Sequence, residues 1–277
     1  MVELSSAAQA KAIDDAIAQW RQGDCVLGEH FIAYRVDPTA PLTSAAAKAT
    51  SDTDLVEDEV VGFVVVTQTC DIVRKCTDRP FVEIAPLVDG GAELNEIMKG
   101  RRLNRAYIPG LANQRLVADL DRTMTVEKSV IAKWSRVSGW STDAEGRAIT
   151  KALVRKRQRF AFPDDFVGWV KPLDVRLKDK HSKNTPEGEF LRSLSEIRVR
   201  AAPAWDAERI ELHFWFIYDS ATPQTDQMVQ LFKACLARIP AIARFFEVAG
   251  QLVTLDDMTA RDYVESDSLD LDHLSEQ

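Results

Sequence analysis

The chain has 277 residues, of which 45% are hydrophobic and 28% charged, and its formal net charge is −8. This composition is that of a globular protein large enough for one or two domains, and the charge excludes a surface that binds polyanions everywhere. No apolar run reaches the ~20 residues that span a bilayer. Four cysteines and no signal peptide are typical of a reducing compartment. We therefore expect a cytoplasmic protein without membrane contact.

The first half of the chain is predicted to be rich in strands. Its most apolar run, Phe63–Val66, has no polar break and indicates a strand buried on both faces. The next strand is expected to pair with it as a hairpin. The elements predicted here are a helix over 6–22, one long strand or a strand pair over 25–36, a mobile loop over 38–58, and strands over 59–66, 81–88, 105–108 and 115–120.

The second half begins with helical patterns and returns to strands. The predicted elements are helices over 93–99, 126–134, 144–160 and 164–170, a β-hairpin from 197 to 218, a helix over 225–239 and a strand over 245–255. This order predicts an α+β fold. We expect a β-rich, barrel-like domain over 1–140, a basic helical segment over 141–190, and a β-hairpin–helix unit with an acidic C-terminus over 191–277.

Small polar residues, Thr67 to Asp71, follow the buried strand directly. A rigid strand that delivers hydroxyls, a thiol and a carboxylate at its end is a common support for a site. Cys70 is a candidate nucleophile or ligand and Asp71 a candidate acid, base or ligand. A thiolate would need a basic neighbour such as His30 or Arg74. The same pattern also fits a small buried cysteine and an aspartate that closes a turn.

Two metal sites are open alternatives to this arrangement. Candidate zinc ligands are Cys25, His30, Cys70 and Cys76, although the Cys-x4-His and Cys-x5-Cys spacings are wider than those of strong zinc motifs. Candidate magnesium ligands of a nuclease are Asp24, Asp71 and Glu83, although no lysine follows Glu83 at the usual strand position. Neither pattern is specific, so we predict no metal and no other cofactor.

A basic segment runs from Arg147 to Lys183. Its eleven basic residues and four aspartates give a local charge of +7, and aromatic residues such as Phe160 and Trp169 lie between them. This pattern predicts contacts with a nucleic-acid backbone and stacking on bases. It equally fits a solvated helix face, or a partner for the acidic C-terminus. The candidate contacts are Arg155, Lys156, Arg157, Arg159, Lys178 and Lys180.

Two short blocks, Gln22-Gly-Asp-Cys-Val-Leu and Gly62-Phe-Val-Val-Val-Thr, resemble strands of the MazF/PemK-like toxin family. That family consists of SH3-like barrels that cleave RNA without a metal. The resemblance implies an N-terminal SH3-like β-barrel. It places Thr67 at the family's Ser/Thr position and makes Arg35 the nearest candidate for its basic catalytic residue. The Arg-Pro that precedes the second strand in that family is missing here.

Three further blocks resemble a group of bacterial proteins from phage-defence gene neighbourhoods. They are Val-Val-Thr-Gln-Thr-Cys-Asp-Ile, Arg-Phe-Ala-Phe-Pro-Asp-Asp and Leu-Asp-Leu-Asp-His-Leu-Ser. Together the resemblances imply a nucleic-acid-interacting protein of bacterial defence or toxin type, with an RNase as one form and RNA or DNA as partner. The alternatives are a non-enzymatic binding or adaptor subunit of a multi-protein defence complex, and a cysteine- or zinc-dependent enzyme.

Overall fold

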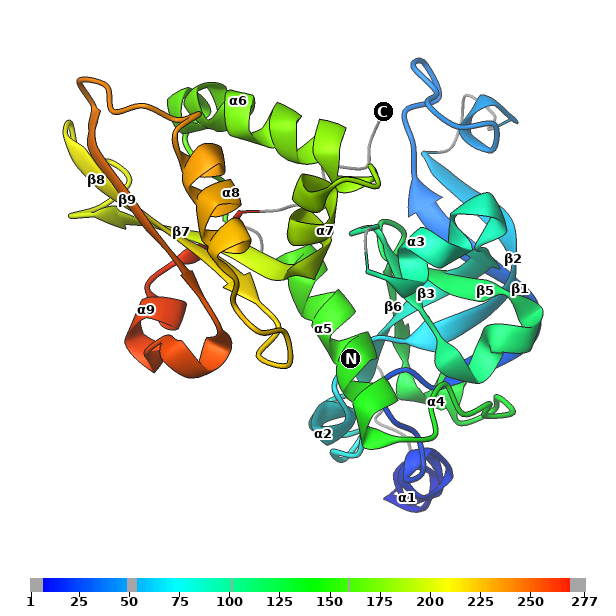
Figure 1. The fold of residues 1–277 in the computed structure, drawn as a ribbon. Coiled ribbons are helices and arrows are strands. Elements are labelled where there is room, and N and C mark those ends of the chain that lie inside the picture. The colour runs from blue at the N-terminus through cyan, green and yellow to red at the C-terminus, as the bar shows by residue number, and fades with distance from the viewer. Residues whose placement is uncertain (1–6, 49–53, 101, 159, 270–277) are drawn as a thin grey trace. The chain divides into compact units, whose positions relative to one another are not determined.

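The computed structural model describes residues 7–48, 54–100, 102–158 and 160–269 (Figure 1). The fold is α+β, as predicted, and the chain divides into two compact units, residues 1–158 and 159–277. Each unit contains one β-sheet. The predicted basic segment is shared between the units, because α5 (Asp143–Arg157) belongs to unit 1 and α6 (Asp164–His181) to unit 2. None of the described helices is long and apolar enough to cross a membrane.

Unit 1 contains a six-stranded sheet with the strand order β1-β2-β3-β5-β4 and with β6 paired to β3. The described elements of unit 1, besides α5, are α1 (Ala7–Ile17), β1 (Cys25–Arg35), η1 (Ala46–Lys48), β2 (Leu55–Val65), α2 (Thr69–Ile72), β3 (Phe81–Asp89), η2 (Gly91–Glu93), α3 (Leu94–Met98), β4 (Arg105–Tyr107), η3 (Pro109–Gln114), β5 (Leu116–Asp119), β6 (Met124–Glu127) and α4 (Lys128–Ile131). Among the described strands β1 and β4 do not pair, so the sheet is open and the predicted SH3-like barrel is not confirmed.

The apolar run at the end of β2 is buried on both faces of this sheet, as predicted. Successive side chains of a strand point to opposite faces. Phe63 and Val65 therefore enter a core with Ile84, whereas Val64 and Val66 enter a second core on the other side. An uninterrupted apolar run is what a strand covered on both faces requires.

The β1–β2 hairpin bends at Gly62, which has a φ of 151°. A Cβ atom at this position would lie 2.1 Å from the carbonyl oxygen of Val26, so only glycine fits. The register of β1 also shifts between Leu27 and His30. Beyond the bend one face of the hairpin lies on the core and the other is exposed.

Unit 2 contains a four-stranded sheet with the order β10-β7-β8-β9. Its elements besides α6 are α7 (Pro186–Ser193), β7 (Leu194–Ala202), β8 (Ile210–Tyr218), α8 (Asp226–Leu236), β9 (Phe245–Val253), η4 (Leu255–Asp257), α9 (Ala260–Val264) and β10 (Asp267–Leu269). The β7–β8 pair is the predicted hairpin, and β9 pairs with β8 in parallel after the crossover through α8. Phe166, Phe190, Phe214 and Phe232 bring α6, α7, β8 and α8 into one core.

Several predicted boundaries are wrong, and tertiary pairing explains most of the differences. The predicted loop over 38–58 ends earlier, because β2 already begins at Leu55, which pairs in register with Arg35 of β1. The predicted helix over 126–134 is the end of β6, which pairs with β3, followed by the short helix α4. Helix α6 continues to His181 through Pro172 rather than ending at 170.

Candidate functional site

The Thr67–Asp71 motif forms a turn and a short helix, α2, directly after β2. The strand ends at Val65, so strand alternation does not decide which way these side chains point. The Thr67 hydroxyl accepts a hydrogen bond from the backbone N–H of Glu83 at 2.6 Å. This contact continues the β2–β3 pairing past the last residue of β2. The Thr67 hydroxyl therefore has a structural role in the hairpin.

Cys70 is exposed, and Asp71 is half-buried. The Cys70 sulfur lies 3.7 Å from Gln68 Oε1 in the same turn. The Asp71 carboxylate lies 3.6 Å from Arg74 Nε, as a local pair three residues apart. Cys70 is therefore not the small buried cysteine of the structural alternative. The polar partner of its sulfur is a neutral amide, which does not activate a thiol as an adjacent cation would.

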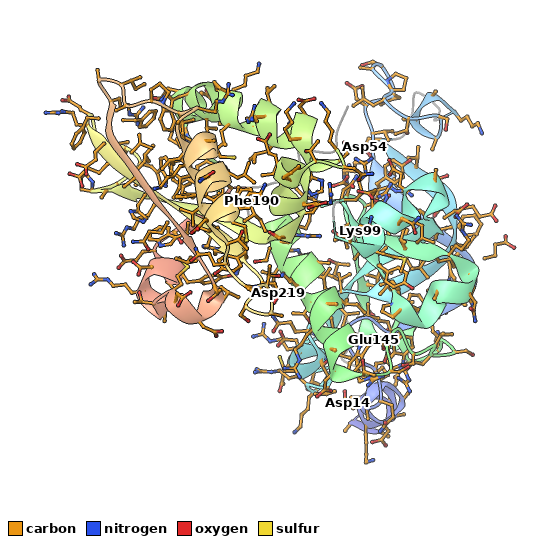
Figure 2. All side chains as sticks on the ribbon, in the orientation of Figure 1. Asp14, Asp54, Lys99, Glu145, Phe190 and Asp219 are labelled. Carbon is orange, nitrogen blue, oxygen red and sulfur yellow. The ribbon has the colours of Figure 1, made fainter. Side chains whose placement is uncertain are left out.

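Arg35 lies at the other end of the hairpin from Thr67. It is the last residue of β1, is paired in register with Leu55, and forms an ion pair with Asp54. Figure 2 shows Asp54 at this end of unit 1. The eleven residues of β2 separate the two positions, which is roughly 35 Å of strand. The predicted catalytic set of Thr67, Cys70, Asp71 and Arg35 is therefore not brought together.

A buried lysine that the sequence patterns did not indicate holds the backbone after the motif. Lys128, the first residue of α4, is 1% exposed. Its ammonium donates to the carbonyl oxygens of Asp71 at 2.9 Å and Arg74 at 2.6 Å. Burial lowers the pKa of Lys128, and the nearby Asp14 carboxylate acts in the opposite direction. A cation beside the last carbonyls of a short helix satisfies groups that have no partner within the helix.

The segment after α2 is also tied to α1. The Asp14 carboxylate accepts a hydrogen bond from the backbone N–H of Cys76 at 2.8 Å, and the Cys76 sulfur lies 3.5 Å from the carbonyl oxygen of Ala10. Burial, followed by Asp14, raises the pKa of the Cys76 thiol. The Cys76 thiol is therefore kept protonated. It packs against a helix and does not face a reacting group.

The predicted zinc ligands lie in different surroundings. Cys25 is fully buried, with its sulfur 3.3 Å from the carbonyl oxygen of Gly23, and burial followed by Asp24 raises the pKa of its thiol. The His30 ring packs against Phe63, and burial lowers its pKa. Within the described residues no three histidines, cysteines or acids form a group that could hold a metal ion. The zinc and magnesium alternatives therefore have no structural support.

Asp24 shows why the magnesium ligands do not converge. Its carboxylate is fully buried and accepts hydrogen bonds from Arg136 Nη1 at 2.8 Å, the backbone N–H of Arg21 at 2.8 Å and that of Gly139 at 3.3 Å. A Cβ atom on Gly139 would lie 1.7 Å from the carbonyl oxygen of Gly23, so the two backbones meet here. Asp24 therefore fixes the crossing of two irregular segments.

Gln22 links the motif to α5. Its backbone N–H donates to the Thr69 hydroxyl at 3.1 Å, and its side-chain Nε2 donates to the carbonyl oxygen of Val66 at 2.8 Å. Its Oε1 accepts a hydrogen bond from the Thr150 hydroxyl at 2.9 Å. Both the amide nitrogen and the amide oxygen of the Gln22 side chain therefore have hydrogen-bond partners. The network is structural, and no pattern in the sequence pointed to it.

The basic segment is largely neutralised by acidic partners. In unit 1, Arg157 pairs with Glu83 at 2.6 Å, and Lys156 pairs with Asp121. The guanidinium of Arg155 lies beside Gly100, where a Cβ atom would approach it to 2.7 Å. These three candidate contacts therefore face unit 1 itself and hold α5 in place.

In unit 2 the bases pair within or next to α6. Lys178 pairs with Asp174 at 3.0 Å, and Lys180 pairs with Asp179 at 2.6 Å. Hydrogen bonds from lysines hold the pKa of Asp179 at about 2. Arg159, the remaining candidate, lies outside the described residues. Three aromatic residues of this region, Phe162, Phe166 and Trp169, pack on the unit 2 core, as expected for a solvated helix face. Phe160 is 41% exposed.

Comparison with known proteins found no relative: no family model, curated protein or solved structure matches the chain.

Proposed function

We propose that the chain is a non-enzymatic binding subunit that holds a protein partner on the outer face of the β1–β2 hairpin. The observation that carries the proposal is the exposure of three large apolar side chains on this face: Phe31 at 52%, Val61 at 51% and Leu55 at 49%. We call this surface the hairpin face. It consists of Phe31, Ala33, Arg35, Leu55, Glu57, Glu59 and Val61.

The register of the hairpin explains why these residues share one face. Phe31 lies opposite Glu59, and Arg35 lies opposite Leu55. The alternate residues, such as Ile32 and Val60, are buried in the core. The apolar side chains of the hairpin face therefore cannot reach that core. An exposed apolar group with polar residues around it marks an interaction surface.

The charges of the hairpin face indicate the chemistry of the partner. Glu57 and Glu59 lie between the apolar residues, and the one base, Arg35, is paired with Asp54. A partner with apolar side chains surrounded by lysine or arginine would complement this surface. Membership of a bacterial defence complex rests on the sequence resemblance alone. In that setting the partner is another subunit of the complex.

The separation of Thr67, Cys70 and Arg35 supports binding in preference to catalysis. Acid–base and nucleophilic catalysis need the reacting groups within hydrogen-bond reach of one another. The contacts of Thr67 and Arg35 instead serve the two ends of the hairpin. The Cys70 sulfur contacts the Gln68 amide within its own turn.

The test compares two double variants of the tagged full-length chain, expressed together with the genes that neighbour its own. Phe31→Glu/Val61→Glu changes the hairpin face. Val167→Glu/Val175→Glu changes two valines of α6 with similar exposure. We expect a stoichiometric partner to copurify with the wild type and with the α6 variant, and to be lost with the hairpin variant. Equal retention by both variants, or the absence of any stoichiometric partner, would contradict the proposal.

A second candidate function is nucleic-acid binding, with RNA cleavage by an SH3-like barrel as its toxin-type form. The observation that favours it is the exposure of Lys151 on α5 and Lys171 on α6, within a segment of charge +7. These two lysines suit a test better than Arg155, Lys156 and Arg157, which hold α5 on unit 1. Changing them removes charge without breaking the α5 contacts described above.

The experiment measures binding of single-stranded RNA and duplex DNA at several salt concentrations, together with RNA cleavage. A nucleic-acid binder would lose affinity steeply as salt rises, and Lys151→Glu/Lys171→Glu would flatten the salt slope by about 1 for each phosphate that is no longer neutralised. Lys75→Glu/Lys133→Glu, at two exposed positions outside the basic segment, is the matched control. No binding at ~50 mM salt, where electrostatic contacts are strong, would exclude this candidate and leave the hairpin-face proposal intact.

A further inference from the structure

The edges of the two sheets differ in how well they are protected. An exposed edge strand offers unpaired N–H and C=O groups to another strand, and proteins block such edges with bulges, charges or very short strands. In unit 1, β1 carries Glu29, a bulge and a bridge from Cys25 to Val137, and β4 has three residues. In unit 2, β10 also has three residues.

Strand β9 has none of these protections along most of its length. It has nine residues, contains no proline or lysine, and carries one charge, Glu247. It pairs with β8 on one side and with no described strand on the other. A register shift affects only its first residues, where Ile242 N–H also donates to the carbonyl oxygen of Phe245. Residues 247–251 therefore form a regular edge with no described strand partner, whereas the carbonyl oxygen of Leu252 accepts a hydrogen bond from Gln224 Nε2 at 3.3 Å.

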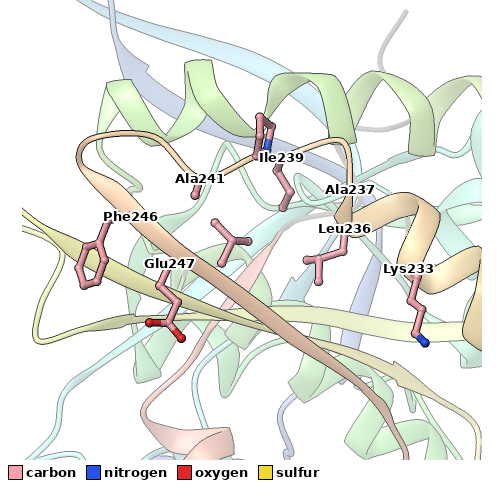
Figure 3. A pocket seen from close by; sticks show the side chains of 9 residues that line it. Lys233, Leu236, Ala237, Ile239, Ala241, Phe246 and Glu247 are labelled. Carbon is pink, nitrogen blue, oxygen red and sulfur yellow. The ribbon is translucent and has the colours of Figure 1, made fainter.

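A groove runs beside the same edge, between β9 and the end of α8 (Figure 3). It has a volume of about 450 Å³ and is lined by Leu236, Ile239, Phe246 and Val248, with the charges of Lys233 and Glu247. The groove and the open strand adjoin one another because Val248 belongs to both. An occupant that extended the sheet at β9 would also cover this apolar surface.

We propose that the occupant is β9 of a second copy of this chain, paired antiparallel about a two-fold axis near Gly250. Such pairing joins two four-stranded sheets into one continuous sheet. The two-fold axis keeps both α8 helices on the same side of that sheet. Val248, which lines the groove, then lies beside Leu252 of the other copy.

The sequence of β9 is complementary to itself in this register. Val248 lies opposite Leu252 of the second copy, and Ala249 lies opposite Gln251. Glu247 lies opposite Val253, so the two glutamates are at opposite ends and no like charges face each other. Directly opposed side chains are the unit of stabilisation in antiparallel pairs.

Sedimentation of the full-length chain at ~1 to 100 µM tests the proposal, and we expect a dimer. The variant Ala249→Lys/Gln251→Lys would place introduced ammonium groups opposite one another on both sides of the axis. We expect dimerisation to weaken at least tenfold. The matched control, Ser182→Lys/Asn184→Lys, adds the same charge at exposed positions after α6 and should dimerise as the wild type does.

Two results would overturn the inference. One is a wild-type chain that stays monomeric at ~100 µM, which would leave β9 open to a strand of another protein. The other is a β9 variant that dimerises as strongly as the wild type. If circular dichroism shows that the β9 variant is unfolded, hydrogen exchange of the wild type at high and low protein concentration is measured instead of sedimentation of the variant. Dilution should then deprotect amides within 247–253, and unchanged protection across the dimer transition would contradict β9 pairing.

Discussion

The two units stabilise their sheets by different means. The described buried polar side chains of unit 1 include Asp24, Asp119 and Lys128, whereas in unit 2 the buried polar side chain is Ser266. The unit 2 core is a continuous apolar cluster formed by the helices and one face of β7 and β8. Unit 1 thus combines apolar cores with buried charges, and unit 2 relies on apolar packing.

The difference follows from the course of the backbone. In unit 1, the segments near Asp24 and after α2 are irregular, and their N–H and C=O groups need partners that no strand or helix provides. Asp24 and Lys128 supply those partners. Two of the three described buried charges of unit 1, Asp24 and Lys128, therefore lie beside irregular backbone, and the third, Asp119, pairs with Arg105 and Arg122.

The largest effect is expected from Asp24→Ala. Removing the fully buried carboxylate leaves the backbone N–H groups of Arg21 and Gly139 without an acceptor, which costs about 1–3 kcal/mol for each group, whereas Arg136 is exposed and its charge can be hydrated. The free energy of unfolding from urea titration measures it. Asp165→Ala removes the partly exposed pair with Arg244 in unit 2 and should cost less than about 1 kcal/mol. Similar losses in both variants would refute the contrast between the units.

Lys128→Met should have the next largest effect. The change keeps most of the length of the unbranched side chain but removes both hydrogen bonds to the carbonyl oxygens of Asp71 and Arg74, at a cost of about 2–3 kcal/mol. Hydrogen exchange should show faster opening of residues 73–77. The control is Lys133→Met, at an exposed position after α4. If Lys128→Met were neutral, the ammonium would not be what holds this turn.

Acid should weaken unit 2 through His213. Burial, followed by the nearby Arg200 charge, lowers the pKa of His213, while Asp262 on α9 opposes the shift. Because the folded pKa is below the ordinary value of 6.5, the unfolded chain binds the proton more readily. The stabilisation is therefore full above about pH 6.5 and is lost as pH falls through the folded pKa.

This pH dependence can be measured as the difference in Tm between about pH 7.5 and about pH 5.5, on either side of the ordinary imidazole pKa. His213→Gln should reduce that difference relative to the wild type. His30→Gln is the matched variant in unit 1, where burial also lowers the pKa of the imidazole. An unchanged pH dependence in His213→Gln would show that its protonation does not couple to folding.

The smallest effect is expected from Lys178→Ala on α6. Its pair with Asp174 is partly exposed and lies within one helix, where such pairs contribute about 0.3–0.5 kcal/mol. Urea titration at low and high salt should show a small loss that disappears at high salt. A loss above about 1 kcal/mol would mean that unit 2 also depends on its charges.

The sequence by itself determined the regular parts of this protein. The unbroken apolar run Phe63–Val66 predicted a strand buried on both faces, and the alternation after Ile197 predicted the β7–β8 hairpin. These patterns are local, because a strand shows its burial through the order of its own residues. The α+β class followed from the order of such segments.

The tertiary structure decided where the chemistry-bearing residues lie. No local pattern indicates that Lys128 reaches the carbonyl of Asp71, that Asp24 meets Arg136, or that the bases of α5 pair with Glu83 and Asp121. These contacts join residues 35 to 112 positions apart. Buried polar side chains lie where folding places backbone N–H and C=O groups that need a hydrogen-bond partner. For that reason the sequence suggested a reactive motif at Thr67–Asp71. In the fold this segment is a turn and a short helix held by hydrogen bonds from Lys128 to the carbonyl oxygens of Asp71 and Arg74.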